Sequence, residues 1–317
     1  MEKDILVRFE DVLKFYPIDR IHQQKNALDY IKVKELREKT GFGARKISKI
    51  INVSEGTVNH WLIGKNTPRA VKGIKQLESM GLLPLKISDS RAFCHFLRTL
   101  GLRYSDGCIY EQKRNNTLTF YLCFGDKDDA LKFVKDSKNC WDINLEIHQG
   151  TNAYYIYLPA SLARLMLSVG SIKGDKTTQN FGLPKWILNL TDNLKAEFLS
   201  GLFSGDADTP RLKSSGRALE SLRLSLSSEK SISKEFSESF MKDIFNLIIS
   251  MGIKATSPSI KYNQPRVSKN GRVTYPIYIR ILTERQNITR FLQKIKYTYR
   301  NKAVKNTEII LNKLTEI

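Results

Sequence analysis

Two aspartates, each closing an apolar helical pattern, are the residues of this 317-residue chain whose types and spacing point most directly to chemistry. Asp206 ends a run in which Leu199 and Leu202 recur at helical spacing. A carboxylate at a helix C-terminus faces the negative end of the helix dipole, which disfavours it by roughly 0.3–1 kcal/mol unless a cation lies beside it. A divalent metal ion would supply that cation. The alternative is a core helix whose terminal acid points into water.

The same pattern occurs one hundred residues upstream, in residues 97–106. Gly101 there matches Gly201, and Asp106 matches Asp206. Repetition at this spacing indicates two similar half-domains. Glycines let two such helices approach closely, and their packing would bring the two aspartates together at one end. We therefore predict Gly101 and Gly201 at a helix interface and Asp106 and Asp206 as a carboxylate pair that binds a divalent metal.

These two segments resemble the paired motifs of a single-chain LAGLIDADG homing endonuclease. In that family each motif forms a helix at a pseudo-two-fold interface, and the acid that closes the motif binds the catalytic metal. The resemblance implies catalytic and metal-binding roles for Asp106 and Asp206, with Mg²⁺ as the cofactor. Residues 174–176 followed by residues 183–187 are similar to the segment that introduces the second motif in archaeal-type members. The sequence departs from the family pattern at Arg103, Tyr104 and Ala207, and both acids are retained.

The charge of the chain indicates a polyanionic partner. There are 52 Lys and Arg against 32 Asp and Glu, a formal net charge of +20, as expected of a protein that binds nucleic acid. No segment approaches the ~20 consecutive apolar residues that span a bilayer. We therefore expect no membrane partner and a cytoplasmic, nucleoid-associated protein. The cysteines and histidines show no paired ligand spacing, which argues against a zinc site or a disulfide framework.

A second DNA-binding unit is indicated near the N-terminus. Residues 33–70 contain two helical patterns separated by a tight turn, with Ser54 as the N-cap of the second helix. This arrangement resembles a helix-turn-helix, whose second helix enters the major groove; a helical hairpin that contacts protein is the alternative. The resemblance places Glu55, Thr57, Asn59 and His60 at base edges and Arg45, Lys46, Lys65 and Arg69 nearer phosphates.

The segments around the two acids alternate between strand and helix patterns in the order of a LAGLIDADG half. Strands are predicted at 108–111, 117–124, 145–148, 153–158, 209–213, 222–227, 259–262 and 273–282, and helices at 128–137, 160–169, 232–251 and 286–295. The predicted fold class is α+β, a pseudo-symmetric pair of αββαββα halves with antiparallel, saddle-shaped sheets, preceded by an all-α helix-turn-helix domain. The predicted domains are residues 1–85 (helix-turn-helix core 33–70), 86–190 and 191–317.

One face of each sheet would pack on helices and leave the other face for a DNA duplex. Basic residues on or beside the predicted strands are the expected contacts: Arg211, Arg223, Lys261, Arg266, Lys269 and Arg280. Tyr121 is a further candidate, whereas the alternation of Tyr155 and Tyr157 is typical of packing within a sheet. Because a one-residue slip moves a side chain to the opposite face, these positions depend on strand register.

We predict a Mg²⁺-dependent, site-specific double-strand DNA endonuclease of the LAGLIDADG type, in which the helix-turn-helix aids target recognition. One chain supplies both halves, so a monomer suffices. Lys176, Thr209 and Gln112 are candidates for auxiliary polar or basic groups near the metal. Two alternatives stay open: a DNA-binding transcriptional regulator built on the same scaffold that does not cleave, and an intron maturase, for which the partner is RNA.

Overall fold

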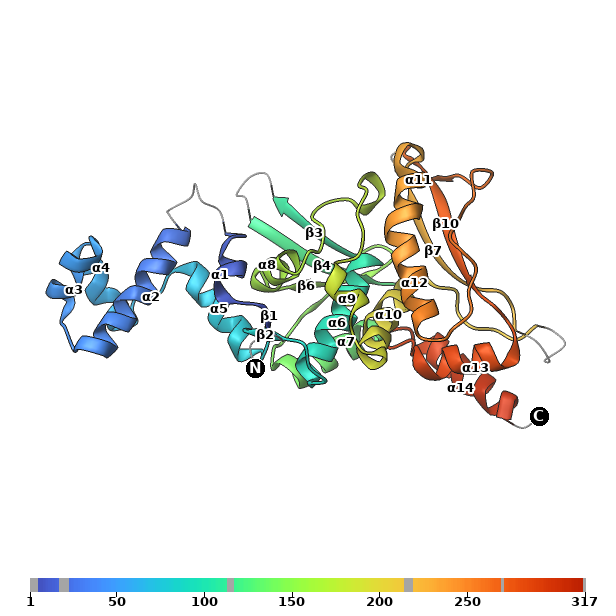
Figure 1. The fold of residues 1–317 in the computed structure, drawn as a ribbon, viewed down its shortest axis with the longest axis horizontal. Coiled ribbons are helices and arrows are strands. Elements are labelled where there is room, and N and C mark those ends of the chain that lie inside the picture. Colours follow the sequence, from blue (N-terminus) through green and yellow to red (C-terminus); the bar gives the residue numbers. More distant parts are fainter. Residues whose placement is uncertain (1–4, 17–22, 113–116, 214–218, 269–270, 316–317) are drawn as a thin grey trace.

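The computed structural model describes residues 5–16, 23–112, 117–213, 219–268 and 271–315. The molecule is elongated, with helices α2 to α4 at one end and two antiparallel sheets on either side of a central helix pair (Figure 1). That pair consists of α6 (Arg91–Tyr104) and α10 (Asp192–Asp206). The fold is therefore a mixture of helices and antiparallel sheets, with the two motif segments in its middle.

The first sheet is antiparallel with the strand order β3-β4-β6-β5. Alternate residues such as Ile109, Phe120 and Ile156 are fully buried, whereas Tyr110 and Tyr157 on the opposite face are partly exposed. Helices α7 and α8 contact the buried face. The elements are β3 (Gly107–Gln112), β4 (Thr117–Phe124), α7 (Lys127–Trp141), β5 (Ile147–Gln149), β6 (Tyr154–Leu158) and α8 (Ala160–Ser168). Among the described residues, these elements lie where the sequence patterns predicted them.

The second sheet has the order β7-β10-β8, and the short strand β9 also pairs with β10. Its elements are β7 (Leu222–Ser228), β8 (Ser259–Ile260), β9 (Arg266–Val267) and β10 (Val273–Ile281). Leu224 and Ile279 face each other in register and are fully buried. Helices α13 (Arg285–Lys294) and α14 (Asn301–Thr315) follow, and α14 was not predicted from the sequence.

Two predictions for the second half need correction. Residues 209–213 do not form a strand: within the described residues their pairing is the isolated bridge between Leu212 and Leu219. The predicted long helix at 232–251 is present as consecutive turns of α11 (Ser233–Phe236), a π-helical turn (Ser237–Met241) and α12 (Lys242–Ser250). The π turn lies where Phe236 and Phe240 stack with ring centroids 5.5 Å apart, and periodicity alone does not reveal it.

The N-terminal segment has two parts. Helices α1 (Phe9–Leu13) and α5 (Arg69–Ser79) contact α8 of the first half, and β1 (Ile5–Val7) pairs with β2 (Leu85–Lys86). Helices α2 (Gln23–Thr40), α3 (Ala44–Ile51) and α4 (Glu55–Leu62) instead contact one another and extend away from the sheets (Figure 1). We call α2 to α4 the helical arm.

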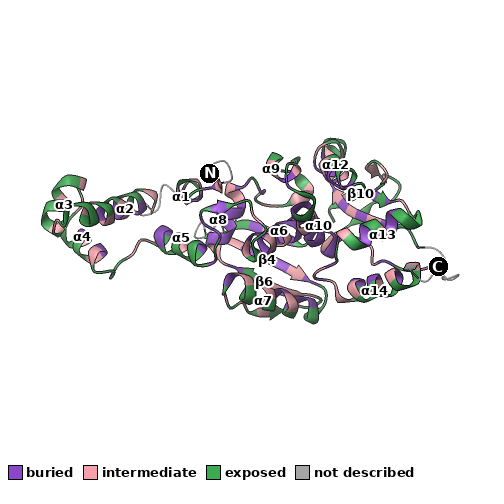
Figure 2. Ribbon diagram, turned by 60° about the horizontal axis from the view of Figure 1, so that its bottom comes forward, coloured by how far each residue is buried: buried purple, intermediate pink, exposed green. Residues whose placement is uncertain are grey.

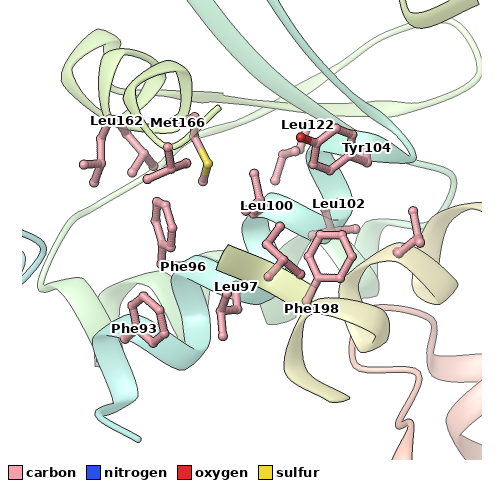
Figure 3. Close-up of a cluster of buried hydrophobic side chains, with 14 of the residues drawn as sticks. Phe93, Phe96, Leu97, Leu100, Leu102, Tyr104, Leu122, Leu162, Met166 and Phe198 are labelled. Atoms are coloured by element: carbon pink, nitrogen blue, oxygen red, sulfur yellow. The ribbon is translucent and has the colours of Figure 1, made fainter. Parts of the chain in front are cut away.

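The central helices are buried on nearly all sides, which is the environment of a helix that is apolar all round. Figure 2 shows this contrast with the helical arm, where exposed residues predominate. In α6, Phe96 lies toward Leu162 and Met166 of α8, while Tyr104 lies beside Phe198 of α10 (Figure 3). The core therefore holds α6 between α8 and α10.

Candidate functional site

Gly101 and Gly201 form the closest approach between α6 and α10. A Cβ atom added to Gly101 would overlap the carbonyl oxygen of Phe198, and a Cβ atom added to Gly201 would overlap the carbonyl oxygen of Arg98. Each helix thus presents a glycine to the backbone of the other. The contact is reciprocal, and it sets where the C-terminal ends of both helices lie.

Asp106 and Asp206 lie together at those ends. Asp206 is the last residue of α10, and Asp106 follows the C-cap of α6, Ser105. The Asp106 Oδ2 atom lies 2.8 Å from the position that a Cβ on Gly205 would take, so its carboxylate rests against the residue immediately before Asp206. The structure therefore brings together the two acids that the sequence singled out.

The electrostatics of the acid pair favour a nearby cation. Burial raises the pKa of Asp106, and burial followed by the Asp106 carboxylate raises the pKa of Asp206. Lys176 and Arg300 act in the opposite direction on both carboxyl groups. Two carboxylates that repel each other in a partly buried site are stabilised by cations placed between or beside them.

Lys176 is one of the cationic side chains that lie beside the acids. Its Nζ donates to the carbonyl oxygens of Tyr104, at 3.1 Å, and of Ser105. These are C-terminal carbonyls of α6, which have no partner within the helix. Burial lowers the pKa of Lys176, and the Asp206 carboxylate partly opposes that effect. Of the three auxiliary candidates, Lys176 is the one that lies directly beside the acids.

The segment that carries Lys176, residues 171–179, is called the inter-motif loop here. The backbone N–H of Gly174, at φ +94°, donates to the carbonyl oxygen of Ile109 on β3 at 2.7 Å. Asp175 caps the short helix Lys176–Thr178 and pairs with Arg272 from the second half. The loop is thus attached to both halves and passes beside the acids.

Thr209 and Arg211 line the same cavity as Asp106, which measures about 580 Å³. Gln112 is elsewhere: it lies at the far end of β3 from Asp106, and its Nε2 donates to Thr119 Oγ1 at 3.1 Å. Of these two candidates, Thr209 lines the cavity at Asp106 and Gln112 does not.

Arg300 is a site residue that the sequence did not reveal. It lines the Asp106 cavity, donates to the carbonyl oxygen of Ala207, and lowers the pKa of both aspartates. Lys302 lines the same cavity. Both residues precede or begin α14, far along the chain from either motif, and the basic character of that segment was the one available signal.

The donor set of the acid pair fits a hard divalent cation. Carboxylate oxygens, substrate phosphates and water are the ligands that Mg²⁺ prefers, and one or two protein carboxylates are enough. Within the described ranges, no group of three or more His, Cys, Asp or Glu side chains could hold a metal ion. A pair of carboxylates leaves the remaining coordination positions of such a cation to water or substrate.

The outer face of the second sheet carries a cluster of arginines. Arg223 and Arg280 are directly paired across β7 and β10. Arg266 crosses the same face and donates to Ser227 Oγ at 3.1 Å and to Ser225 Oγ at 3.0 Å. Arg223 also pairs with Asp208 at 2.7 Å. Lys261 follows β8 and is partly buried, and Lys269 lies outside the described residues.

The outer face of the first sheet is aromatic. Tyr121 makes edge or tilted ring contacts with Tyr110, Tyr155 and Tyr157, at centroid distances of 5.8–6.2 Å. His148 extends the cluster through Tyr157. The predicted packing role of Tyr155 and Tyr157 agrees with these contacts, although Tyr157 remains 48% exposed. The two sheets thus present chemically different faces.

The helical arm contains two short helices joined by a turn at Asn52, whose φ of 54° is left-handed. The predicted N-cap is present, since Ser54 Oγ accepts from the backbone N–H of Thr57. On α4 and just after it, Glu55, Asn59 and Lys65 are exposed and Thr57 and His60 are partly exposed; on α3 and α5, Arg45, Lys46 and Arg69 are exposed.

All four cysteines are free, and each is partly buried: Cys94, Cys108, Cys123 and Cys140. No helix in the described part of the chain is both long and apolar enough to traverse a bilayer.

Comparison with known proteins finds no matching family model. The curated relatives include the DNA-directed RNA polymerase subunit Rpo1N of Methanocaldococcus jannaschii, 26% identical over 81% of this chain and 19% of its own length. They also include the tRNA-splicing ligase RtcB of Pyrococcus abyssi, 28% identical over 70% of this chain and 24% of its own length. The replication factor C small subunit of M. jannaschii is 23% identical over 93% of this chain and 16% of its own length. The chain therefore spans less than a quarter of each of these relatives.

Solved structures that resemble this chain include homing endonucleases. I-WcaI bound to its DNA recognition sequence has a TM-score of 0.43 and 15% identity, over 77% of this chain and 92% of that one. The LAGLIDADG meganuclease I-AabMI bound to uncleaved DNA has a TM-score of 0.38 and 13% identity, over 70% and 92%. A variant of I-DmoI in complex with its nicked target DNA in the presence of manganese has a TM-score of 0.38 and 13% identity, over 64% and 95%. These TM-scores do not decide the function.

Proposed function

We propose that this chain is a site-specific double-strand DNA endonuclease of the LAGLIDADG homing type. One observation carries the proposal: two glycine-bearing helices pack against each other and bring Asp106 and Asp206 together between two antiparallel sheets. A carboxylate pair of this kind suits metal-assisted phosphodiester hydrolysis. The inter-motif loop, with Gly174 and Lys176 beside the acids, supports the archaeal type.

Asp106 and Asp206 would hold Mg²⁺, which supplies activation of water and stabilisation of the leaving oxygen when it is bound. Lys176 places its ammonium group beside both carboxylates and would contribute positive charge toward the scissile phosphate. Arg300 and Arg211 line the adjoining cavity and would bind flanking phosphates. Each of these groups comes from the one chain, which favours an active monomer.

The outer faces of the two sheets would hold the duplex on either side of the acids. Arg223, Arg266 and Arg280 on the second sheet suit contacts to phosphates and to guanine edges. The aromatic face of the first sheet suits apolar contacts, such as those with thymine methyl groups. The two halves would therefore read different sequences, as expected for a single-chain enzyme with an asymmetric target.

The helical arm would extend the contact with DNA as a helix-turn-helix. Its second helix, α4, is capped, short and exposed on the side of Glu55 and Asn59. Recognition helices enter the major groove with their first turns at the base edges. The basic residues Arg45 and Lys46 on α3 would lie toward the backbone.

The curated relatives fit a self-contained module. Their names describe three different proteins, and the part that each shares with this chain is less than a quarter of its length. A nuclease module that is common to the three relatives would explain why proteins with different names share a segment with this chain.

Cleavage of a randomised duplex library in Mg²⁺, Ca²⁺ or EDTA tests the proposal. We expect double-strand breaks at one sequence with Mg²⁺ and none with EDTA. Tight, salt-sensitive and sequence-selective binding without cutting under any metal would refute the enzyme and leave the DNA-binding regulator. Selective binding of structured RNA over duplex DNA would instead favour a maturase.

A further inference from the structure

Arg103 is a fully buried arginine to which the proposed cleavage chemistry assigns no role. Its side chain has 0% exposure, and within the described residues no carboxylate lies at ion-pair distance from it. Its Nε atom has no hydrogen-bond partner there. Burying a guanidinium without a counter-charge is costly. The hydrogen bonds of Arg103 are what an apolar side chain of similar volume would not supply.

The two hydrogen bonds that Arg103 makes connect the acid segment to the inter-motif loop. Nη1 donates to the carbonyl oxygen of Gly107 at 3.1 Å, and Nη2 donates to the carbonyl oxygen of Ile172 at 2.8 Å. Gly107 directly follows Asp106, and Ile172 lies four residues before Lys176. The planar guanidinium of Arg103 therefore connects the backbone that carries Asp106 to the backbone that leads to Lys176.

We propose that Arg103 is a positioning residue that fixes the inter-motif loop so that Lys176 stays beside Asp106 and Asp206. This inference rests on the proposed function and assigns a role to a residue that departs from the family pattern. The Arg103 guanidinium holds the start of the loop in place through its hydrogen bond to Ile172. The hydrogen bond between Gly174 and Ile109 holds the middle of the loop in place. Lys176 Nζ then reaches the α6 carbonyls of Tyr104 and Ser105.

The chain offers a matched control in Arg164. This arginine on α8 is also buried, has an unpartnered Nε within the described residues, and donates to a backbone carbonyl, that of Ala160, at 3.0 Å. Its guanidinium lies over the ring of Tyr16, and among the described residues no hydrogen bond or ion pair joins Arg164 directly to the inter-motif loop. Arg103→Met and Arg164→Met therefore remove similar interactions, but only Arg103→Met removes a hydrogen bond to the loop.

The first readout does not need activity. Acetylation of Lys176 by an amine-reactive ester, followed by peptide mass spectrometry, reports whether its Nζ is held against the α6 carbonyls. We expect Arg103→Met to raise the rate of Lys176 acetylation several-fold above wild type, and Arg164→Met to leave it unchanged. An unchanged rate in Arg103→Met, or an equal rise in both variants, would overturn the proposal.

The second readout is the single-turnover cleavage rate at saturating DNA, measured beside the Kd for the same duplex. We expect Arg103→Met to slow cleavage by roughly 10- to 100-fold, the scale of a small misplacement of a reacting group, with Kd unchanged. Arg103→Lys, which keeps a charge and donors, should recover part of the rate; it also carries the test if Arg103→Met does not fold. A rise in Kd with no loss of rate would contradict positioning. Absence of cleavage by wild type counts against the endonuclease, and the acetylation result then decides the role of Arg103.

Discussion

Gly201 meets the carbonyl oxygen of Arg98 so closely that no side chain fits between them, and this contact fixes the crossing of the two motif helices. We expect Gly201→Ala to lower the free energy of unfolding by about 1–3 kcal/mol, because the added methyl forces two backbones apart. Denaturant unfolding measures the change. Gly125→Ala is the control, since a Cβ there meets nothing within 4 Å and should leave stability within about 0.5 kcal/mol of wild type. Equal stability of Gly201→Ala and wild type would contradict the close crossing.

Because of His95, we expect the free energy of unfolding to decrease as the pH is lowered. It is fully buried between Ser137 Oγ and Tyr299 OH, each 3.0 Å from a ring nitrogen, and burial, with a smaller contribution from Arg98, lowers its pKa well below 6.5. The unfolded chain therefore binds a proton near pH 6.5 that the folded protein does not. Between pH 7.5 and 5.5 we expect His95 to account for a loss of about 1.4 kcal/mol in the free energy of unfolding.

Denaturant unfolding at the two pH values, with His95→Gln beside wild type, isolates this contribution. The variant should lose about 1.4 kcal/mol less than wild type on acidification. Parallel pH profiles for wild type and His95→Gln would show that His95 is not buried in its neutral form.

Arg280 is expected to bind a DNA phosphate or base edge on the second sheet. It is exposed, and it lies directly across from Arg223 in the register of β7 and β10. Arg280→Ala should weaken duplex binding and reduce the slope of log Kd against log salt by about one unit. Lys138→Ala on α7, which removes an exposed charge paired with Asp142, should leave the slope unchanged. Equal slopes for both variants would place the duplex elsewhere.

Asn59 tests the helical arm. It is exposed on α4, five residues after the N-cap Ser54. If α4 reads the major groove, Asn59→Ala should cost about 1–3 kcal/mol in binding to the selected target, with the loss confined to bases at one end of the site. Glu38→Ala on α2 is the control. Binding of Asn59→Ala to every base variant with wild-type affinity would assign the arm to a protein contact instead.

The local elements of both halves were predictable because their patterns are strong. The alternation of Leu118, Phe120 and Leu122 marks β4, and the repeated glycines mark two helices that must approach closely. The bridge at Leu212 and the π turn at Phe240 were not predictable, since tertiary packing decides both.

The convergence of the two acids was predictable because the motif is repeated, whereas contacts from segments without a motif were not. Asp106 and Asp206 follow from the repeat, whereas Arg300 reaches the acids because the segment that precedes α14 packs against the C-terminal end of α10. The partners of Arg103 are backbone carbonyls, which leave no pattern in a sequence.

The most direct test of the endonuclease is cleavage of the selected duplex by Asp106→Asn and Asp206→Asn, with DNA affinity measured in parallel. Each substitution removes one carboxylate but keeps the shape of the side chain. We expect Mg²⁺-dependent cleavage to fall by at least about 100-fold in each variant while DNA binding and folding are retained. Cleavage at the wild-type rate by either variant would contradict a shared metal site between the two helices.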